Sequence, residues 1–526
     1  MRLINVEGYE TGSLKIEEFY DEDIPPYAIL SHTWGEEEVT LRDMEETYAK
    51  RTAKKGPIHS RVMDIFAVTR KKGYPKIHMT CAIAKAHGLG YAWVDTCCID
   101  KTSSAELAEA INSMYRWYQK ASVCYVFLAD VESMDDFEKS RWFTRGWTLQ
   151  ELIAPKQMIF FNRSWEKLGT KRELRDEIQT RTRIPGSALS GIGDMSSFCI
   201  AQKMSWAANR YTSRLEDRAY SLLGLFDINM PLLYGEGEKA FIRLQEELMK
   251  AYDDPSILLW ASKDQSHGGL LATSPDAFEA CADVYLQATP HTIQERRWTL
   301  DNKGVHLNIP ILPVGHSGLV LGILGGIDIQ REDFRSVGLQ SKGIGIYLQN
   351  SSYEGAVFRK VWSDRFEVVE NYDYFQANFL TKTIRVPQPR RAGTGIPVLR
   401  QRRTPISYAA EGGHLEVIWL LWNWPGIDLH AADDQGWTPW SYAAREGKKE
   451  IIQFLLSQPQ VDQYMVDGSG RTLLSHAAEC GRHEVIELIT RDFQQSIGLA
   501  EVGVNRCCGT LCAGTFHGIM PHEAKD

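Results

Sequence analysis

A seven-residue motif recurs near the C-terminal end of the chain at a fixed spacing of 34 residues. It begins at Thr404, Thr438 and Thr472 and reads TPISYAA, TPWSYAA and TLLSHAA. Each copy is followed by a glycine-containing turn and then by an apolar segment of helical pattern. A unit this short cannot bury its hydrophobic face alone, so neighbouring copies must stack to form a continuous core. The sequence therefore predicts a helical repeat array at this end of the chain.

The three copies resemble the ankyrin repeat, whose TPLHxA motif here reads TPISYA, TPWSYA and TLLSHA. We assign the repeats to residues 404–495. Three repeats are about the minimum that buries a shared core. The resemblance implies a protein-binding surface or a module that restrains another domain. The alternative is an array that only caps the preceding domain.

The first part of the chain alternates short apolar runs with helical patterns. Helices are predicted over Lys76–His87 and Ala105–Gln119. Alternating strands and helices of these lengths are typical of a doubly wound parallel sheet. The four apolar runs that we interpret as buried strands are Tyr27–Ser31, Tyr91–Asp95, Val123–Leu128 and Met158–Phe161.

Polar and aromatic residues follow the first three of these strands. In open parallel sheets, ligands bind beyond the carboxyl ends of the strands. Residues after different strands should therefore gather at one edge, which we call the rim. The residues predicted to form the rim are Ser31, His32, Trp34, Gly35, Asp95, Asp100, Arg145, Trp147 and Glu151.

Three sequence blocks around the rim carry a second resemblance. They read YAILSHTWG, YAWVDTCCIDK and RGWTLQELIAP, and a fourth block follows at Arg214–Glu247. Over about residues 1–260 the chain resembles the heterokaryon-incompatibility (HET) domain of filamentous fungi. The stretch 51–74 looks longer than the usual connection. The resemblance implies a role in non-self recognition, in which the HET domain triggers growth arrest or cell death.

We assign the HET domain to residues 1–254, with an α/β core over about 20–165 and a helical extension. A more distant resemblance links it to TIR domains, whose sheet is flavodoxin-like. In NAD-cleaving TIR domains an essential glutamate lies in a W-C-x-x-E pattern. Trp147 and Glu151 keep that spacing, although Thr148 replaces the cysteine.

The TIR resemblance implies that NAD is a substrate and that no cofactor is required. A carboxylate can stabilise the positive charge that develops on ribose when an N-glycosidic bond breaks. On this interpretation Glu151 is the catalytic residue, and Asp95 and Asp100 position the sugar. Trp34 or Trp147 would stack on a base, and Arg145 would hold phosphate oxygens.

Each of these residues also has a structural interpretation. Glu151 is alternatively an exposed helical acid or an ion partner of Arg145. Trp34 and Trp147 are alternatively core or interface aromatics, and His32 a hydrogen-bonded loop residue. A second function thus remains open, in which the HET domain is a non-enzymatic scaffold that acts by self-association. Self-association does not exclude catalysis.

Composition narrows the setting of the protein. A net charge of -9 argues against a dedicated nucleic-acid binder, which normally presents a basic face. No stretch approaches the ~20 apolar residues that span a bilayer, and the first residues do not resemble a signal peptide. The ten cysteines do not follow disulfide spacings, and no metal site is predicted. We therefore expect a cytoplasmic protein.

The remaining segments carry no chemical motif. Residues 255–386 contain many short β-like runs, among them Val305–Ile309 and Gly343–Leu348, and predict a β-rich domain of unknown role. Residues 387–403 are rich in Pro, Gly and Arg and are interpreted as a linker. Residues 496–526 are predicted to be a disordered tail.

Overall fold

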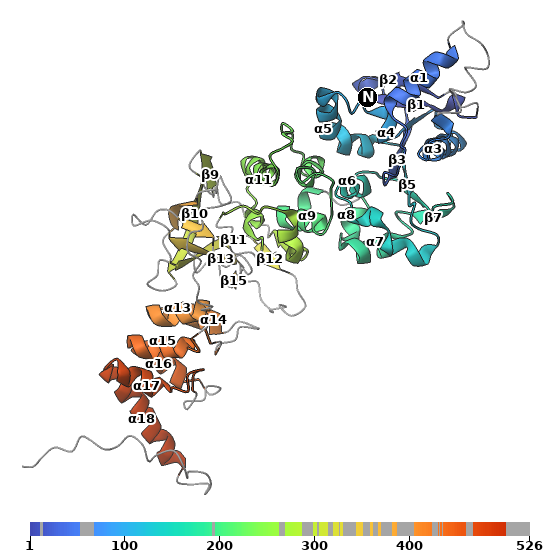
Figure 1. Cartoon of the computed structure of the whole chain (residues 1–526). Helices are drawn as coiled ribbons and strands as arrows, with labels where there is room; N and C mark the ends of the chain where they lie inside the picture. The colour runs from blue at the N-terminus through green and yellow to red at the C-terminus, as the bar shows by residue number, and fades with distance from the viewer. Residues whose placement is uncertain are drawn as a thin grey trace, which may run out of the picture. The chain divides into compact units, whose positions relative to one another are not determined.

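The structure is a computed structural model of the whole chain (Figure 1). It describes residues 1–10, 14–52, 68–191, 195–261, 269–286, 298–301, 304–313, 319–325, 327–329, 343–350, 358–360, 367–369, 381–386, 404–422, 430, 432–433, 435–458 and 466–500. Most of the long stretch 51–74, the linker 387–403 and residues 501–526 therefore lie outside the described residues.

The N-terminal region contains a seven-stranded sheet in the order β2-β1-β4-β3-β5-β6-β7. The four predicted strands form its parallel centre: β3 (Tyr27–His32), β4 (Tyr91–Trp93), β5 (Val123–Phe127) and β6 (Met158–Phe161). Three antiparallel strands outside this centre were not predicted: β1 (Arg2–Asn5), which lies between β2 and β4, and the two edge strands β2 (Lys15–Glu18) and β7 (Lys167–Thr170). They are four residues long and partly polar, so their pattern is weak.

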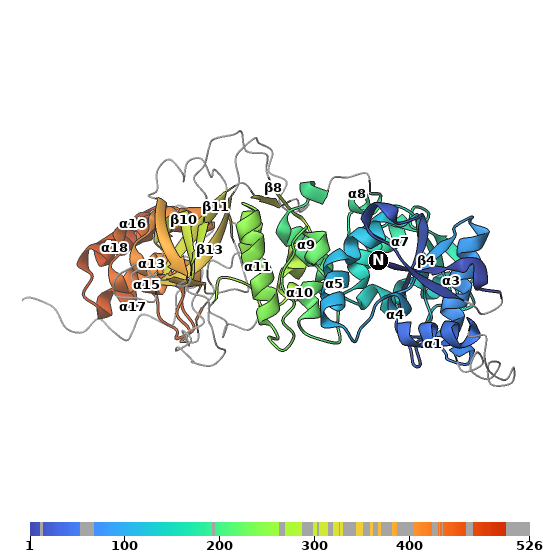
Figure 2. The ribbon, with the colours of Figure 1, turned by 90° about the horizontal axis from the view of Figure 1, so that it is seen from above.

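Helices cover both faces of this sheet, as predicted. The helix α3 (Tyr74–Ala86) leads from β3 to β4, and α5 (Ser104–Lys120) leads from β4 to β5. The two helices lie on opposite sides of the strands (Figures 1 and 2). This arrangement follows because β4 and β5 flank β3, so two crossovers of the same hand must place their helices on opposite faces.

Six further α-helices lie in the described residues between 148 and 251. In chain order they are α6 (Thr148–Ile153), α7 (Arg175–Thr182), α8 (Gly186–Leu189), α9 (Ile200–Ala207), α10 (Asp217–Tyr220) and α11 (Lys239–Ala251). The 3-10 helix η6 (Leu223–Leu225) packs closely on α5. A Cβ atom on Gly224 would lie 2.0 Å from Cβ of Tyr115, so only glycine permits this contact.

The middle region is β-rich, as predicted. Its main sheet has the order β14-β13-β11-β10-β16, with β9 and β15 paired to β10 and β13. The bounds are β9 (Trp298–Asp301), β10 (Gly304–Pro313), β11 (Leu319–Gly325), β13 (Gly343–Asn350), β14 (Phe358–Lys360), β15 (Glu367–Val369) and β16 (Thr381–Val386). A separate pair consists of β8 (Val284–Leu286) and β12 (Ile327–Ile329).

The repeat region is helical, and each repeat supplies two helices. They are α13 (Pro405–Gly412), α14 (Leu415–Trp422), α15 (Pro439–Glu446), α16 (Lys449–Leu456), α17 (Leu473–Glu479) and α18 (His483–Ala500). The motif threonine accepts a hydrogen bond from the backbone N–H three residues later in every copy, and therefore caps the first helix. The turn glycines Gly413, Gly447 and Gly481 have positive φ angles of 85°, 73° and 63°.

The chain divides into two compact units. One contains residues 1–312 and 320–398, and the other contains residues 313–319 and 399–526. The helix α18 reaches Ala500, past the predicted end of the repeats at residue 495. Within the described ranges, no helix is both long and apolar enough to cross a membrane.

Candidate functional site

The carboxyl ends of β3 and β4 lie where the chain leaves toward opposite faces of the sheet. After β3 the chain forms α1 (Leu41–Thr52) and then α3, and after β4 it forms the short helix α4 (Asp95–Cys98) and then α5. Such a switch point is where open α/β sheets form ligand-binding crevices. Successive side chains of a strand point to opposite faces. Ser31 therefore faces Tyr118 and Glu151, whereas His32 faces α3.

Glu151 occupies the α5 side of this edge, in the short helix α6. The Ser31 hydroxyl donates a hydrogen bond to its carboxylate, and the indole N–H of Trp142 donates to Ser31 Oγ at 2.7 Å. Only 8% of Glu151 is exposed, so the interpretation as an exposed helical acid is wrong. Burial raises the pKa of Glu151 to about 7, and the negative charge of Asp95 acts in the same direction.

Asp95 occupies the α3 side of the edge. Its Oδ1 lies 3.0 Å from Nε2 of His32, and Nζ of Lys76 lies 3.0 Å from Nδ1 of the same ring. Because an ammonium only donates, Nδ1 is the acceptor and Nε2–H donates to Asp95. Lys76 also bonds to the Glu38 carboxylate. His32 is thus a buried, fully hydrogen-bonded residue that orients Asp95.

Trp34 lies over Asp95 with 49% of its surface exposed. Its indole N–H donates to Asp95 Oδ2 at 2.7 Å, and the Lys101 ammonium lies 3.6 Å from the ring centroid. Lys101 Nζ is also 3.8 Å from the Asp95 carboxylate. Although burial opposes it, hydrogen bonding from His32 and Trp34 and the charge of Lys101 hold the pKa of Asp95 well below its usual range. Trp34 is therefore an exposed aromatic face, held by two charged groups.

The remaining predicted rim residues have other partners. The backbone N–H of Gly35 donates to Glu38 at 2.7 Å. Asp100 accepts from the backbone and hydroxyl of Thr102 and thus closes a local turn. The Trp147 side chain bonds to Asp217 of α10. The charge of Arg145 acts against the rise in the pKa of Glu151 that burial causes. The backbone carbonyl of Arg145 accepts hydrogen bonds from Thr148 and Arg210.

Several residues of the site were not among the predicted rim residues. Lys76 lies on the buried face of α3, between apolar neighbours. A lysine at a position expected to be buried indicates a charged partner, so the sequence pattern could have identified this residue. Lys101 is the last residue of the second block. Trp142 is fully buried and bonds to Ser31, a role that its sequence position does not indicate. Lys171 and Arg210 are buried as well, and neither lies in a recognised motif.

The site holds two carboxyl groups whose pKa values are shifted in opposite directions. Asp95 is ionised at neutral pH, whereas Glu151 is near its midpoint. Pairs of titratable groups with separated pKa values are a signature of acid–base and charge-stabilising chemistry. An ionised carboxylate beside an exposed indole suits a cationic or electron-poor ring with an adjoining sugar.

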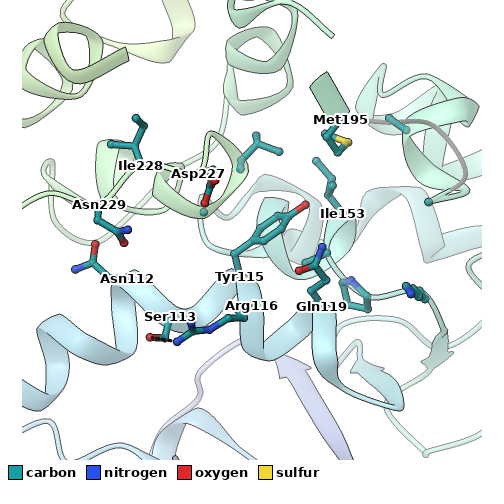
Figure 3. A pocket seen from close by; sticks show the side chains of 17 residues that line it. Asn112, Ser113, Tyr115, Arg116, Gln119, Ile153, Met195, Asp227, Ile228 and Asn229 are labelled. Atoms are coloured by element: carbon teal, nitrogen blue, oxygen red, sulfur yellow. Dashed lines mark hydrogen bonds between the residues drawn. The ribbon is translucent and has the colours of Figure 1, made fainter. Parts of the chain in front are cut away.

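A cavity of about 700 Å³ lies elsewhere in the same unit. Figure 3 shows Asn112, Tyr115 and Gln119 of α5 along one side, with Asp227 and Asn229 facing them. The end of α6 and the following residues 154–156 also line it. Of the described residues that line this cavity, none belongs to the predicted rim. The rim and the cavity are therefore separate features that share α6.

Comparisons with known proteins match both ends of the chain. Residues 27–135 match the family "Heterokaryon incompatibility protein (HET)", a range that includes Ser31 and Asp95 but ends before Glu151. Residues 406–498 match "Ankyrin repeats (3 copies)". A curated relative, the vegetative incompatibility protein HET-E-1 of Podospora anserina, is 43% identical over 274 residues. That match covers 48% of this chain and 19% of the relative. The chain thus contains a heterokaryon-incompatibility domain followed by three ankyrin repeats.

Proposed function

We propose that this protein acts in vegetative incompatibility as an effector that triggers cell death or growth arrest. The HET match and the relative named for vegetative incompatibility support this role. The HET domain would be the active part. The ankyrin array would bind a protein partner or restrain the HET domain, since stacked repeats present extended binding surfaces.

The proposed activity is cleavage of NAD at the rim, by analogy with TIR domains. The observation that carries this proposal is that Asp95, which is bonded to exposed Trp34, lies close enough to buried Glu151 for its charge to add to the rise in the pKa of Glu151 that burial causes. Trp34 would stack on a ring of the dinucleotide. Asp95 would offset the positive charge that develops on ribose. Glu151 would bind a ribose hydroxyl and accept a proton.

The reaction balances without a further reactant. The bond between ribose C1′ and the nicotinamide nitrogen breaks, and its electron pair leaves with nicotinamide. A water oxygen forms the new bond to C1′, and the released proton passes to a carboxylate. The products are nicotinamide and ADP-ribose. Stabilisation of an oxocarbenium-like transition state by a carboxylate is the same principle as in glycoside hydrolysis.

The experiment follows NAD and its products by chromatography, using the full chain at high protein concentration. We expect nicotinamide release that falls by about 100-fold or more in Glu151→Gln and Asp95→Asn. Glu109→Gln is the matched control, because Glu109 is an exposed acid on α5. Full activity in Glu151→Gln would contradict the assignment of Glu151.

A non-enzymatic scaffold is the second candidate, and one observation favours it. The Glu151 carboxylate is already bonded to Ser31 and is 8% exposed, as expected of a residue that stabilises a fold. In this case the HET domain would act by self-association, and the rim would be an interface. Growth arrest on expression, without loss of NAD from cells or purified protein, would support the scaffold over the enzyme.

A further inference from the structure

The helix that carries Glu151 is short and wholly enclosed. All six residues of α6, from Thr148 to Ile153, are buried. A helix of this length is not stable by itself, and its end groups lack intrahelical partners. Its position, and with it the position of the Glu151 carboxylate, must therefore be set by groups from other elements.

Lys171 holds the C-terminal end of α6. Its ammonium donates to the backbone carbonyls of Leu152 at 2.6 Å, Pro155 at 3.2 Å and Ile153 at 3.3 Å. The residue is 5% exposed, and burial lowers its pKa to about 8. A cation at a helix C-terminus is favoured by the helix dipole and supplies donors to the unpaired carbonyls.

Arg210 holds the N-terminal end of the same helix. Its Nη1 donates to the Arg145 carbonyl at 3.0 Å and to Oγ1 of Thr148 at 3.2 Å, and its Nε donates to the Trp206 carbonyl at 2.9 Å. The residue is 4% exposed, and burial lowers its pKa to about 9. A cation near a helix N-terminus is normally unfavourable. Glu151 supplies the opposing negative charge, because it acts to raise the pKa of Arg210.

We propose that Lys171 and Arg210 are positioning residues that clamp α6 from its two ends and so fix the Glu151 carboxylate beneath the rim. Both follow the HET-matched range 27–135, and Arg210 comes from the helical extension after α9. The extension is then part of the site. This inference rests on the proposed function in one respect, namely that Glu151 is the group whose position matters.

Charged and titratable groups reach Glu151 from several packed elements. Asp95 is the first residue of the short helix α4 (Asp95–Cys98), Arg145 follows the 3-10 helix η4 (Arg141–Thr144), and Tyr118 comes from α5. Burial and the charge of Glu151 raise the pKa of Cys124 of β5, and the charge of Lys171 acts in the opposite direction. Although burial raises the pKa of Glu151, the charge of Arg145 acts to lower it. Arg210 is a second, buried cation, bonded to Thr148 of the same helix and interacting with the Glu151 charge. Its removal should therefore raise the pKa of Glu151 further.

The first test follows the titration of Glu151 in the full chain. The readout is the difference in melting temperature between a Glu151→Gln variant and its parent protein as a function of pH, and the midpoint of that difference reports the titration of Glu151. It is measured once with Glu151→Gln alone against wild type, and once with Glu151→Gln added to Arg210→Met. We expect Arg210→Met to raise this midpoint by at least about half a pH unit, because a neighbouring cation favours the carboxylate. Arg210→Lys should retain most of the wild-type midpoint. Arg175→Met, an exposed arginine of α7, should leave it unchanged.

Thr148→Val is a milder variant that keeps the buried volume and removes the hydroxyl that Arg210 contacts. It should shift the midpoint in the same direction by a smaller amount. It also decides the question if Arg210→Met fails to fold. A midpoint that stays at the control value in Arg210→Met, or in Thr148→Val where only that variant folds, would overturn the role of Arg210.

The second test follows α6 itself by amide hydrogen exchange. Lys171→Met should raise exchange in the peptide that contains residues 151–154 by about 10-fold or more, since the carbonyls lose their donor. Lys171→Arg should restore most of the protection. Lys167→Met, on the exposed side of β7, is the control. Unchanged protection in Lys171→Met would overturn the clamp at that end. Neither readout requires NAD turnover, so failure of the proposed reaction remains distinguishable.

Discussion

Two adjacent residues of one strand serve two different networks. Ser31 bonds to Glu151 and Trp142, whereas His32 bonds to Asp95 and Lys76. The alternation of side chains along β3 makes this division necessary. It also separates the environments of the two carboxyl groups. Glu151 is enclosed and lacks a salt bridge among the described residues, while Asp95 has charged and hydrogen-bonded partners.

The pH dependence of stability should reveal the raised pKa of Glu151. A carboxyl whose pKa is about 7 when folded and 4.5 when unfolded stabilises the fold fully below pH 4.5. That contribution, about 3 kcal/mol, is lost as the pH rises through 7. Glu151→Gln should abolish the loss, so the variant gains stability relative to wild type with rising pH.

The measurement is the thermal transition that Glu151→Gln shifts, recorded from pH 4.5 to 8. Glu109→Gln serves as the exposed control and should parallel the wild type. Parallel curves for Glu151→Gln and wild type would mean that Glu151 titrates normally and is not enclosed.

At the scale of elements, close approach rather than polarity joins α5 to the helical extension. Gly224 of η6 packs against the Cα and Cβ atoms of Tyr115, and both residues line the cavity shown in Figure 3. The fourth sequence block contains this glycine, within SLLGLFD. Its conformation is not left-handed, so space and not backbone strain requires glycine.

Gly224→Ala should destabilise the first compact unit by about 1–3 kcal/mol through overpacking against Tyr115. Gly90→Ala is the matched control, because an added Cβ there meets nothing within 4 Å. Unfolding of both variants by urea, followed by tryptophan fluorescence, measures the difference. Equal midpoints would show that α5 and η6 are not in close contact.

At the scale of the whole molecule, the repeat region has its own core. Trp440, Ile451 and Ile452 are fully buried within it, as are the paired alanines Ala443 and Ala444. In the third repeat Ala478 is exposed, because no further described repeat covers it. The array thus ends at the third copy in the part of the chain that the structure describes.

The two compact units should unfold in separate transitions. Trp440→Ala should destabilise the repeat unit by about 3–5 kcal/mol through the cavity it leaves. It should leave the transition of the first compact unit, residues 1–312 and 320–398, unchanged. Calorimetry of the full chain, with Gly224→Ala as the reciprocal variant, checks this. A single transition that moves with either substitution would show that the units unfold together.

Elements with a strong local sequence pattern were predicted, and elements with a weak pattern were not. The parallel centre of the sheet, the β-rich middle region and the helical repeats were all predicted, because each has a repeated local pattern. The antiparallel strands β1, β2 and β7 were missed, because four partly polar residues carry too weak a pattern. The predicted domain boundaries, ligand, self-association and location in the cytoplasm remain predictions.

The site was predicted only in its composition. The sequence predicted that Ser31, His32, Asp95 and Glu151 lie at one edge, since the strands can be recognised from local patterns and the carboxyl ends of parallel strands share an edge. It did not determine that Glu151 is buried, or that Asp95 pairs with His32.

Burial and pairing join residues that are far apart in the chain, such as the 120 positions between Ser31 and Glu151. The sequence by itself thus determined the repeats, the order of the elements and the sheet edge at which the polar residues gather. Only the tertiary structure decided the partner and charge state of each residue. The physical reason is that desolvation and hydrogen bonding depend on neighbours in space, which periodicity along the chain does not encode.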